Sequence, residues 1–273
     1  LCAAHLRAAD ADIDLDGVRR VGRRLAAVVT GSRHRGTIEA VANSLREFCQ
    51  LIRWRQELAD LPGELVNAPL VAMETASYSV TRRSAGLPLL LTSVLSAVCA
   101  GQWSEPLLDR TVARLLRCVD SPKVHALNLL RAVVREAALY NATTRHHEAI
   151  TRATLTNFSD RSWAVRNACV QLLGALSQRM LGVGRPHITP TEFFSAYPRL
   201  QRCFLEVLVR GANPSSAKFI AHQATVPVLS FLSQLSPDPP TALLDNVEPF
   251  RQPLVTLLSS PVYAIRLMAA KSL

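Results

Sequence analysis

Two adjacent arginines, Arg82 and Arg83, precede a glycine and a proline within an otherwise apolar, helix-like stretch. A guanidinium group offers a planar fork of donors that fits a phosphate or a carboxylate, so the pair is a candidate anchor for RNA or for an acidic protein surface. The alternative is a simple helix end, with Pro88 starting the next helix and the arginines solvated. We favour a contact, because Leu87 would be a poor N-cap directly before Pro88 and Gly86 adds about 1 kcal/mol of helix cost.

The residues after this pair predict a distortion of the backbone. Residues 73–98 have the apolar periodicity of a helix. Pro88, however, lacks an N–H, and its ring would clash with the carbonyl of Ser84, which costs about 3 kcal/mol in a helix interior. We therefore expect a kink or a break at Pro88.

The histidines do not form an obvious catalytic or metal site. His125 and Asn128 are three residues apart and share a helical face, where a lone histidine is expected to be a structural hydrogen-bonding group. In His146-His147-Glu148, adjacent side chains on a helix point about 100° apart, unlike the i, i+4 pair that binds zinc. We expect no metal at either place.

Other signatures of catalysis are missing from the sequence. Gly182-Val183-Gly184 is the nearest approach to a glycine-rich nucleotide loop, but it follows a helical pattern and lacks the remaining glycine. There is no Walker motif, methyl-donor loop or nucleophile constellation. The six cysteines are scattered singly, as expected for reduced core residues. The sequence therefore predicts a protein that is not an enzyme, binds no cofactor and has no small-molecule substrate.

The charge is large and is carried by arginine. The 273 residues have a net charge of +10, and only three of them are lysine. This favours RNA or an acidic protein as partner, although an arginine-rich composition with a solvated surface would give the same total. The basic cluster at residues 19–35 follows four aspartates at 10–16, so we expect local neutralisation. A hydrophobic content of 49% with 5% aromatic residues predicts an aliphatic core, and no apolar stretch is long enough to span a membrane.

A repeated pattern sets the fold. Four similar helix starts place Arg83, His125, Arg166 and Arg266 at separations of 42, 41 and 100 residues. The first two separations match helical repeats of about 40 to 47 residues, and strand signals are weak throughout. We predict an all-α protein, an α-solenoid of HEAT-like or armadillo-like repeats.

The repeats suggest two roles for residues near the helix starts. Arg166 and Arg266 could form a ladder along a concave groove that binds phosphates, but we favour ion pairs between repeats. Arg131 and Arg135 lie on the polar side of one helix and could extend the groove, or could simply be solvated. Trp163 is expected to pack between repeats, and stacking on a splayed base is the alternative.

Several local signals predict helix ends. Ser162 or Asp160 can cap a helix whose apolar stripe begins at Val165 and which Gly182 ends. Residues 189–192 have capping-box spacing. Pro198 restarts a helix that Gly211 is expected to terminate, and an apolar face is expected along residues 124–137.

Three motifs in order, at residues 82–88, 125–131 and 162–168, resemble the thyroid adenoma-associated protein family. The resemblance covers about residues 60 to 273, whereas residues 1–60 have only a generic helical pattern. We therefore divide the chain into 1–60, helical repeats of uncertain register, and 61–273, a repeat region with the family motifs. The chain begins without methionine and stops within a helical pattern, so we expect it to be a piece of a longer protein.

The resemblance implies a helical scaffold that is the non-catalytic partner of an FtsJ-type 2'-O-methyltransferase acting on nucleotide 32 in the tRNA anticodon loop. It also implies that S-adenosylmethionine binds the partner enzyme only, and that tRNA is a second partner in the cytoplasm. The alternative is a general protein-interaction solenoid unrelated to RNA. The residues expected to contact enzyme or tRNA are Arg82, Arg83, Ser84, Ala85, Gly86, Leu87, Pro88, His125, Asn128, Arg131, Trp163, Arg166 and Asn167.

Overall fold

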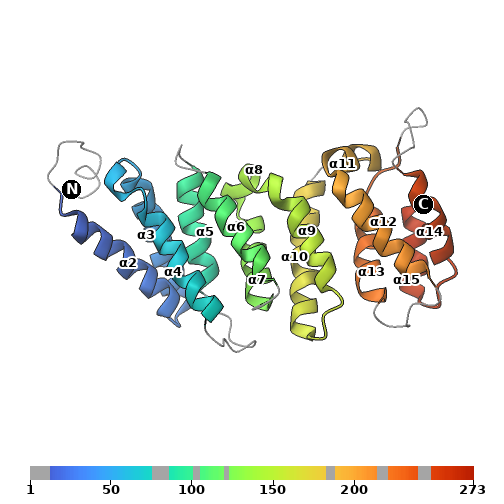
Figure 1. Cartoon of the computed structure of the whole chain (residues 1–273), viewed down its shortest axis with the longest axis horizontal. Coiled ribbons are helices and arrows are strands. Elements are labelled where there is room, and N and C mark those ends of the chain that lie inside the picture. The colour runs from blue at the N-terminus through green and yellow to red at the C-terminus, as the bar shows by residue number, and fades with distance from the viewer. Residues whose placement is uncertain are drawn as a thin grey trace. The chain divides into compact units, whose positions relative to one another are not determined.

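The computed structural model describes residues 13–75, 86–100, 105–119, 123–182, 188–213, 221–238 and 247–273. Within these ranges all regular structure is helical and no strand occurs (Figure 1), which confirms the predicted all-α solenoid. The chain divides into two compact units, Leu1–Arg145 and His146–Leu273. We call them unit 1 and unit 2 and describe each by itself.

Unit 1 is built from helices that alternate in direction. Helix α5 packs between α3 and α7 in one row, and α2 and α4 pack beside each other on the flank. The helices are α2 (Leu15–Gly31), α3 (Arg35–Ile52), α4 (Leu61–Thr75), α5 (Gly86–Cys99), α6 (Glu105–Arg117), α7 (Lys123–Arg135) and the short α8 (Tyr140–Thr143), with 3-10 turns at Gln56–Leu58 and Ala137–Leu139.

Helix α5 is the central element of unit 1. Eleven of its fourteen residues are buried. The helix is mostly apolar, and α2, α3, α4 and α7 pack around it. The helix begins at Gly86, so Pro88 lies in its first turn, where a missing N–H costs no hydrogen bond. The prediction that residues 73–98 do not form one continuous helix is therefore correct, since α4 and α5 are separate helices. The expected position of the break, at Pro88, is wrong, since α5 continues through that residue.

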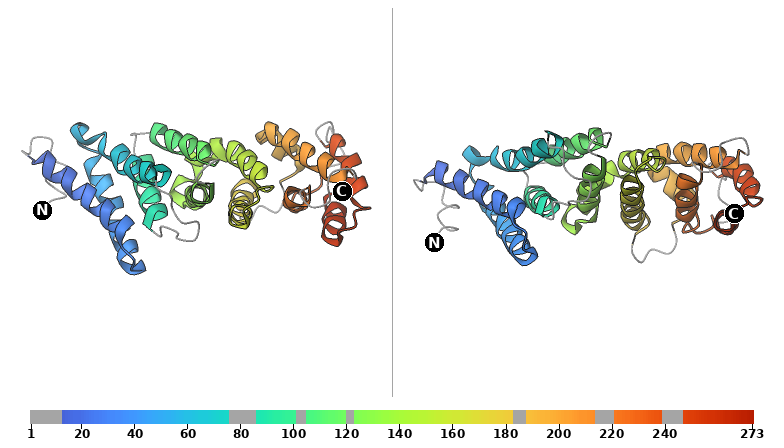
Figure 2. Two further views of the ribbon diagram at one scale, coloured as in Figure 1. Left: turned by 60° about the horizontal axis from the view of Figure 1, so that its bottom comes forward. Right: turned by 90° about the horizontal axis from the view of Figure 1, so that it is seen from below.

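Unit 2 repeats the alternating arrangement in two rows (Figure 2). Helices α9, α12 and α14 pack in one row, and α10, α13 and α15 pack in the other. The helices are α9 (His147–Asn157), α10 (Trp163–Leu181), α11 (Pro190–Ala196), α12 (Pro198–Ala212), α13 (Ala221–Leu232), α14 (Glu248–Leu257) and α15 (Tyr263–Ser272); a 3-10 turn, Thr144–His146, spans the boundary between the units.

Most of the local signals in unit 2 are confirmed. Thr189 and Glu192 form the capping box at the start of α11, and Pro198 begins α12. Gly182 ends α10 with φ of 78°, in the left-handed region that favours glycine. Ser162 occupies the N-cap of α10 but makes no side-chain cap; Asp160 Oδ1 instead accepts from the Ser162 N–H at 2.7 Å.

Two sequence signals were misinterpreted. Gly211 does not end α12, which runs to Ala212; a Cβ at this position would lie 2.5 Å from Oγ1 of Thr225, so the glycine allows α12 and α13 to approach. The predicted apolar face over 124–137 is also too long. Helix α7 ends at Arg135, and Ala137 lies exposed in the following 3-10 turn.

The two units have different cores. The buried apolar side chains of unit 1 are aliphatic, apart from its cysteines and one methionine, as predicted. Unit 2 instead contains a cluster of phenylalanines whose ring centroids are 5.0 to 6.3 Å apart. The cluster is Phe193, Phe194, Phe204, Phe231 and Phe250. The prediction of a uniformly aliphatic core is therefore wrong for unit 2.

Ion pairs between helices neutralise much of the basic cluster in unit 1. Arg19 binds Asp60 with two hydrogen bonds of 3.0 and 2.7 Å, and Arg23 binds Glu64 with two of 2.6 and 3.1 Å. The predicted neutralisation by the upstream aspartates is confirmed for Arg20, which pairs with Asp14 at 3.1 Å. The partners of Arg19 and Arg23 instead lie 41 residues further along the chain. No described helix is long and apolar enough to cross a membrane.

Candidate partner-binding site

A cavity of about 520 Å³ lies between α5 and α7 in unit 1. We call it the α5–α7 groove. Helix α5 contributes apolar side chains from its first two turns, and α7 contributes polar and cationic side chains from one face. The lining residues are Leu87, Pro88, Leu89, Thr92, His125, Asn128, Leu129, Arg131, Ala132, Arg135 and Glu136.

The position of the apolar wall depends on Gly86. A Cβ at this residue would lie 1.8 Å from the carbonyl oxygen of Val29 and 3.2 Å from the Cα of Thr30, so only glycine lets α5 begin against the end of α2. Leu87 is buried and Pro88 is half-buried beside it. The glycine of the motif therefore has a packing role, and the next two residues are placed at the groove.

The polar wall follows from helical spacing on α7. His125, Asn128 and Arg131 are three residues apart, and Arg135 is one further turn along, so all four lie along one face. Burial lowers the pKa of His125, which favours the neutral imidazole. Glu136 at the end of this wall lies 3.5 Å from Arg46 of α3.

The structure brings together some predicted contact residues and separates others. Leu87 and Pro88 share the groove with His125, Asn128 and Arg131, which come from a second motif. Trp163, Arg166 and Asn167 lie at the start of α10 in unit 2. Arg82, Arg83, Ser84 and Ala85 lie outside the described residues. The sequence had not indicated Thr92 or Glu136, although the spacing of Thr92 from Pro88 places both on one helical face.

The arginines that begin the repeats of unit 2 make contacts other than the ion pairs that we favoured from the sequence. Arg166 Nη1 donates to the backbone carbonyls of Asp160 and Arg161, both at 2.9 Å. Arg266 Nη1 donates to the carbonyl of Ser260 at 2.7 Å. These contacts are not ion pairs between repeats; each holds a helix to its own preceding loop. The binding of phosphates by these arginines stays a prediction.

Trp163 does not pack between repeats as predicted. Its side chain is 69% exposed at the first position of α10. Asn167, one turn further, is half-buried. The exposed ring makes the alternative of contact with a partner more relevant than the sequence suggested.

The described residues contain no arrangement suited to metal binding. No group of three or more His, Cys, Asp or Glu side chains in the described part of the chain could hold an ion. His147 is 1% exposed, and burial, together with Arg179 and His146, lowers its pKa to about 4. Burial likewise raises the pKa of Cys49 to about 12, so this thiol is not a ready nucleophile.

A repeat of antiparallel helices with a mixed apolar and cationic groove is typical of a scaffold that binds other macromolecules. The comparisons with known proteins agree with this class. The model of the family THADA/TRM732, DUF2428 matches residues 2–164, and a second model, Trm732, C-terminal TPR repeats, matches residues 166–273. The chain belongs to the THADA/TRM732 family.

Relatives from distant organisms have similar names. The chain is 29% identical over 96% of its length to the chicken (Gallus gallus) protein named tRNA (32-2'-O)-methyltransferase regulator THADA, and 28% identical over 97% to the human protein of that name. It is 27% identical over 74% to tRNA (32-2'-O)-methyltransferase regulator trm732 of Schizosaccharomyces pombe. The chain spans about 15% of the length of each relative. No solved structure matches it.

Proposed function

We propose that this chain is part of a regulatory subunit that supports ribose 2'-O-methylation of nucleotide 32 in the tRNA anticodon loop. The names of its relatives support this role. The subunit is non-catalytic and has no cofactor of its own. Its partner is an FtsJ-type methyltransferase, which binds S-adenosylmethionine and carries the catalytic groups, and the complex acts on tRNA in the cytoplasm.

The observation that supports this proposal most strongly is the meeting of two family motifs in the α5–α7 groove. Leu87 and Pro88 provide an apolar wall, and Arg131 and Arg135 make the opposite wall cationic. Glu136, the acidic residue of the lining, is already close to Arg46. This combination suits a protein segment that presents an apolar side chain next to acidic residues. We assign that segment to the methyltransferase.

The test measures 2'-O-methylation of nucleotide 32 in cells that lack the full-length protein. The native protein should restore the mark, whereas the variants Asn128→Ala and Arg131→Glu should reduce it and weaken co-purification of the methyltransferase. Arg202→Glu is the matched control, because Arg202 is 87% exposed on α12 in unit 2 and is not among the residues that line the groove. The double variant Arg82→Ala and Arg83→Ala tests the part of the motif that the sequence alone proposed.

Each outcome decides a different part of the proposal. A mark that persists in cells without the protein contradicts the regulatory role and favours the general protein-interaction scaffold. A mark that requires the protein but survives both groove variants, with the enzyme still bound, retains the regulatory role and contradicts the assignment of the groove. Expression matched by immunoblot keeps these outcomes separate from loss of the protein itself.

A further inference from the structure

Helices α10 and α15 of unit 2 begin with the same construction. Each has an aromatic residue at its first position, Trp163 in α10 and Tyr263 in α15. In each, the arginine three residues later donates to a backbone carbonyl six residues before itself, Arg166 at 2.9 Å and Arg266 at 2.7 Å. The sequence pattern aromatic-Ala-aliphatic-Arg thus forms the same local structure at two places a hundred residues apart.

A second hydrogen bond fixes each loop. Asp160 Oδ1 accepts from the Ser162 N–H at 2.7 Å, and Ser260 Oγ accepts from the Val262 N–H at 3.3 Å. The residue just before each aromatic is therefore held, and so is the turn that follows. The backbone that carries each ring therefore loses little conformational freedom when a partner binds, which favours affinity.

Both rings are presented to solvent. Trp163 and Tyr263 are each 69% exposed, and the guanidinium carbon of Arg266 lies 5.7 Å from the centre of the Tyr263 ring. A single exposed aromatic residue needs no explanation. Two rings at equivalent positions, each three residues before an arginine that is hydrogen-bonded to the preceding loop, indicate a repeated binding element.

The two rings lie at the same end of unit 2. The chain runs up α10, down α12, up α13, down α14 and up α15, so the loops before α10 and α15 meet the same edge, the lower one in Figure 1. Helices α10, α13 and α15 are neighbours in one row, and all three direct their N-termini to this edge. Helix N-termini carry partial positive charge.

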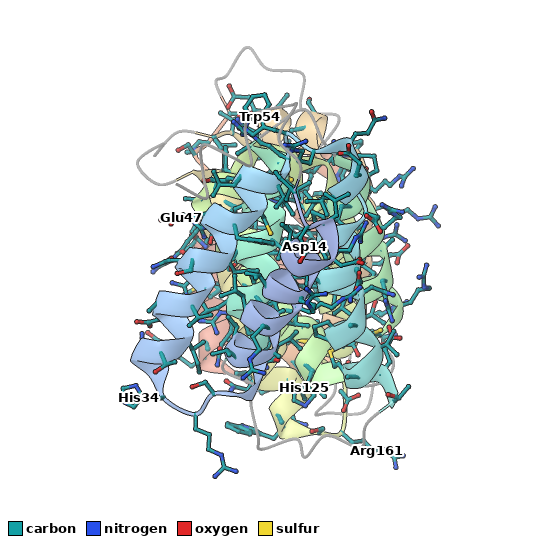
Figure 3. The ribbon with its side chains drawn as sticks, turned by 90° about the vertical axis from the view of Figure 1, so that its left-hand side faces the viewer. Asp14, His34, Glu47, Trp54, His125 and Arg161 are labelled. Atoms are coloured by element: carbon teal, nitrogen blue, oxygen red, sulfur yellow. The ribbon has the colours of Figure 1, made fainter. Side chains whose placement is uncertain are left out.

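The charged side chains of unit 2 are distributed unequally between its ends. Among the described residues at the lower edge, the loops and terminal turns contain four arginines and one aspartate: Arg161, Arg166, Arg210, Arg266 and Asp160. Figure 3 shows Arg161 extending away from the ribbon. At the opposite end the terminal turns and loops contain four acidic residues and four basic residues, so the two kinds balance: Glu148, Glu192, Asp238 and Glu248 with Arg179, Arg199, Arg251 and Lys271.

We propose that this edge binds unpaired nucleotides of RNA, with Trp163 and Tyr263 each stacking on a base and Arg161 contacting the phosphate backbone. We call it the aromatic edge, defined by Trp163, Tyr263 and Arg161. Exposed rings combined with arginine and helix N-termini are how proteins bind single-stranded nucleic acid. The rings belong to α10 and α15, which are separated by α13. Neighbouring helix axes lie roughly 8 to 10 Å apart, so the two rings contact different bases rather than enclose one base.

This inference rests on the proposed function, because it assigns part of the tRNA contact. The test uses the full-length protein and measures binding to two probes, an anticodon stem-loop RNA and a fully paired RNA duplex of equal length. Changing Trp163→Ala should weaken binding to the stem-loop about tenfold, and Trp163→Ala with Tyr263→Ala about a hundredfold. Binding to the duplex should change little. The salt dependence should keep its slope, since stacking releases no counterions.

Control variants separate stacking from damage to the fold. Trp163→Phe with Tyr263→Phe keeps both flat rings and should bind the stem-loop nearly as well as the native protein. Trp54→Ala removes a ring that is 60% exposed in unit 1 and should have no effect; in Figure 3 it lies at the opposite end of that unit from His125. Arg161→Ala should weaken binding to both probes and reduce the salt slope by about one.

Three results would overturn the inference. The double alanine variant could bind the stem-loop as tightly as the native protein, the phenylalanine variant could fail equally, or the double alanine variant could lose the methyltransferase instead of the RNA. The last result would make the edge a protein-docking surface. If the mark at nucleotide 32 still requires the native protein in any of these cases, the proposed function survives without the aromatic edge.

Discussion

The two units differ in the side chains that fill their cores. Unit 1 has an aliphatic core and binds its helices together with ion pairs such as Arg114–Glu74, whose two hydrogen bonds are 2.6 Å each. Unit 2 fills its core with phenylalanines and exposes Trp163 and Tyr263 at its edge. One repeat architecture can therefore be stabilised by either kind of contact, and the side chains not needed for the core become available for partners.

The largest effect is expected in the phenylalanine cluster. Changing Phe204→Ala should lower the free energy of unfolding by about 3 to 5 kcal/mol, because Phe204 is fully buried and contacts three other rings. Phe204→Leu should cost much less. Chemical denaturation checks both, and hydrogen exchange should show the loss in unit 2. An equal loss in unit 1 would contradict the separation of the two cores.

The next effect tests the close helix approach in unit 1. Changing Gly86→Ala should destabilise the protein by about 3 kcal/mol, since the new Cβ would meet the carbonyl oxygen of Val29. Gly174→Ala on α10 is the matched control. Nothing lies within 4 Å of a Cβ there, so the higher helix propensity of alanine should raise stability by about 0.5 to 1 kcal/mol. Thermal denaturation of both variants gives the comparison, and an equal effect of the two changes would contradict the packing role of Gly86.

A smaller effect is expected from the arginine contacts that unit 2 repeats. Changing Arg266→Ala removes a charged hydrogen bond to the carbonyl of Ser260 and should cost about 1 kcal/mol. Hydrogen exchange should become faster in the first turn of α15 and stay unchanged in the phenylalanine cluster. Loss of protection throughout unit 2 would mean that this contact supports the core rather than the loop.

An effect no larger than that of Arg266→Ala is expected from a change of pH in unit 1. The hydrogen bonds from Arg114 lower the pKa of Glu74 from 4.5 to about 2. The stabilisation is therefore complete above pH 4.5 and is lost as pH falls towards 2. Because the pair is partly exposed, the loss should be only about 1 kcal/mol. Glu74→Gln should make the acid unfolding curve shallower in that range, and an unchanged curve would mean that the pair contributes nothing.

The local features of the fold could be predicted from the sequence because their causes are local. The capping box at Thr189, the helix end at Gly182 and the helix start at Pro198 all depend on residues within one turn. Gly86 and Gly211 could not be interpreted, because their partners Val29 and Thr225 lie far along the chain. The sequence gives no measure of how close two helices will come.

The candidate site was predictable in its parts and not as a whole. Leu87, Pro88, His125 and Asn128 were recognised in two separate motifs, but their meeting depends on the packing of α5 against α7. The positive charge of Arg166 and Arg266 suggested a phosphate or a carboxylate as partner. In the structure both bind backbone carbonyl groups, which are present in any loop. Backbone acceptors carry no sequence signature, so this role could not have been inferred.

The boundary between the units has a practical consequence for dividing the protein into pieces. The two family models meet at residues 164–166, inside the first turn of α10, whereas the compact units divide after Arg145. A fragment started at 166 would lose α9, which packs on α10, and with it the contact of Thr151 with the buried Met180. A recombinant fragment that starts at His146 keeps this pair of helices together.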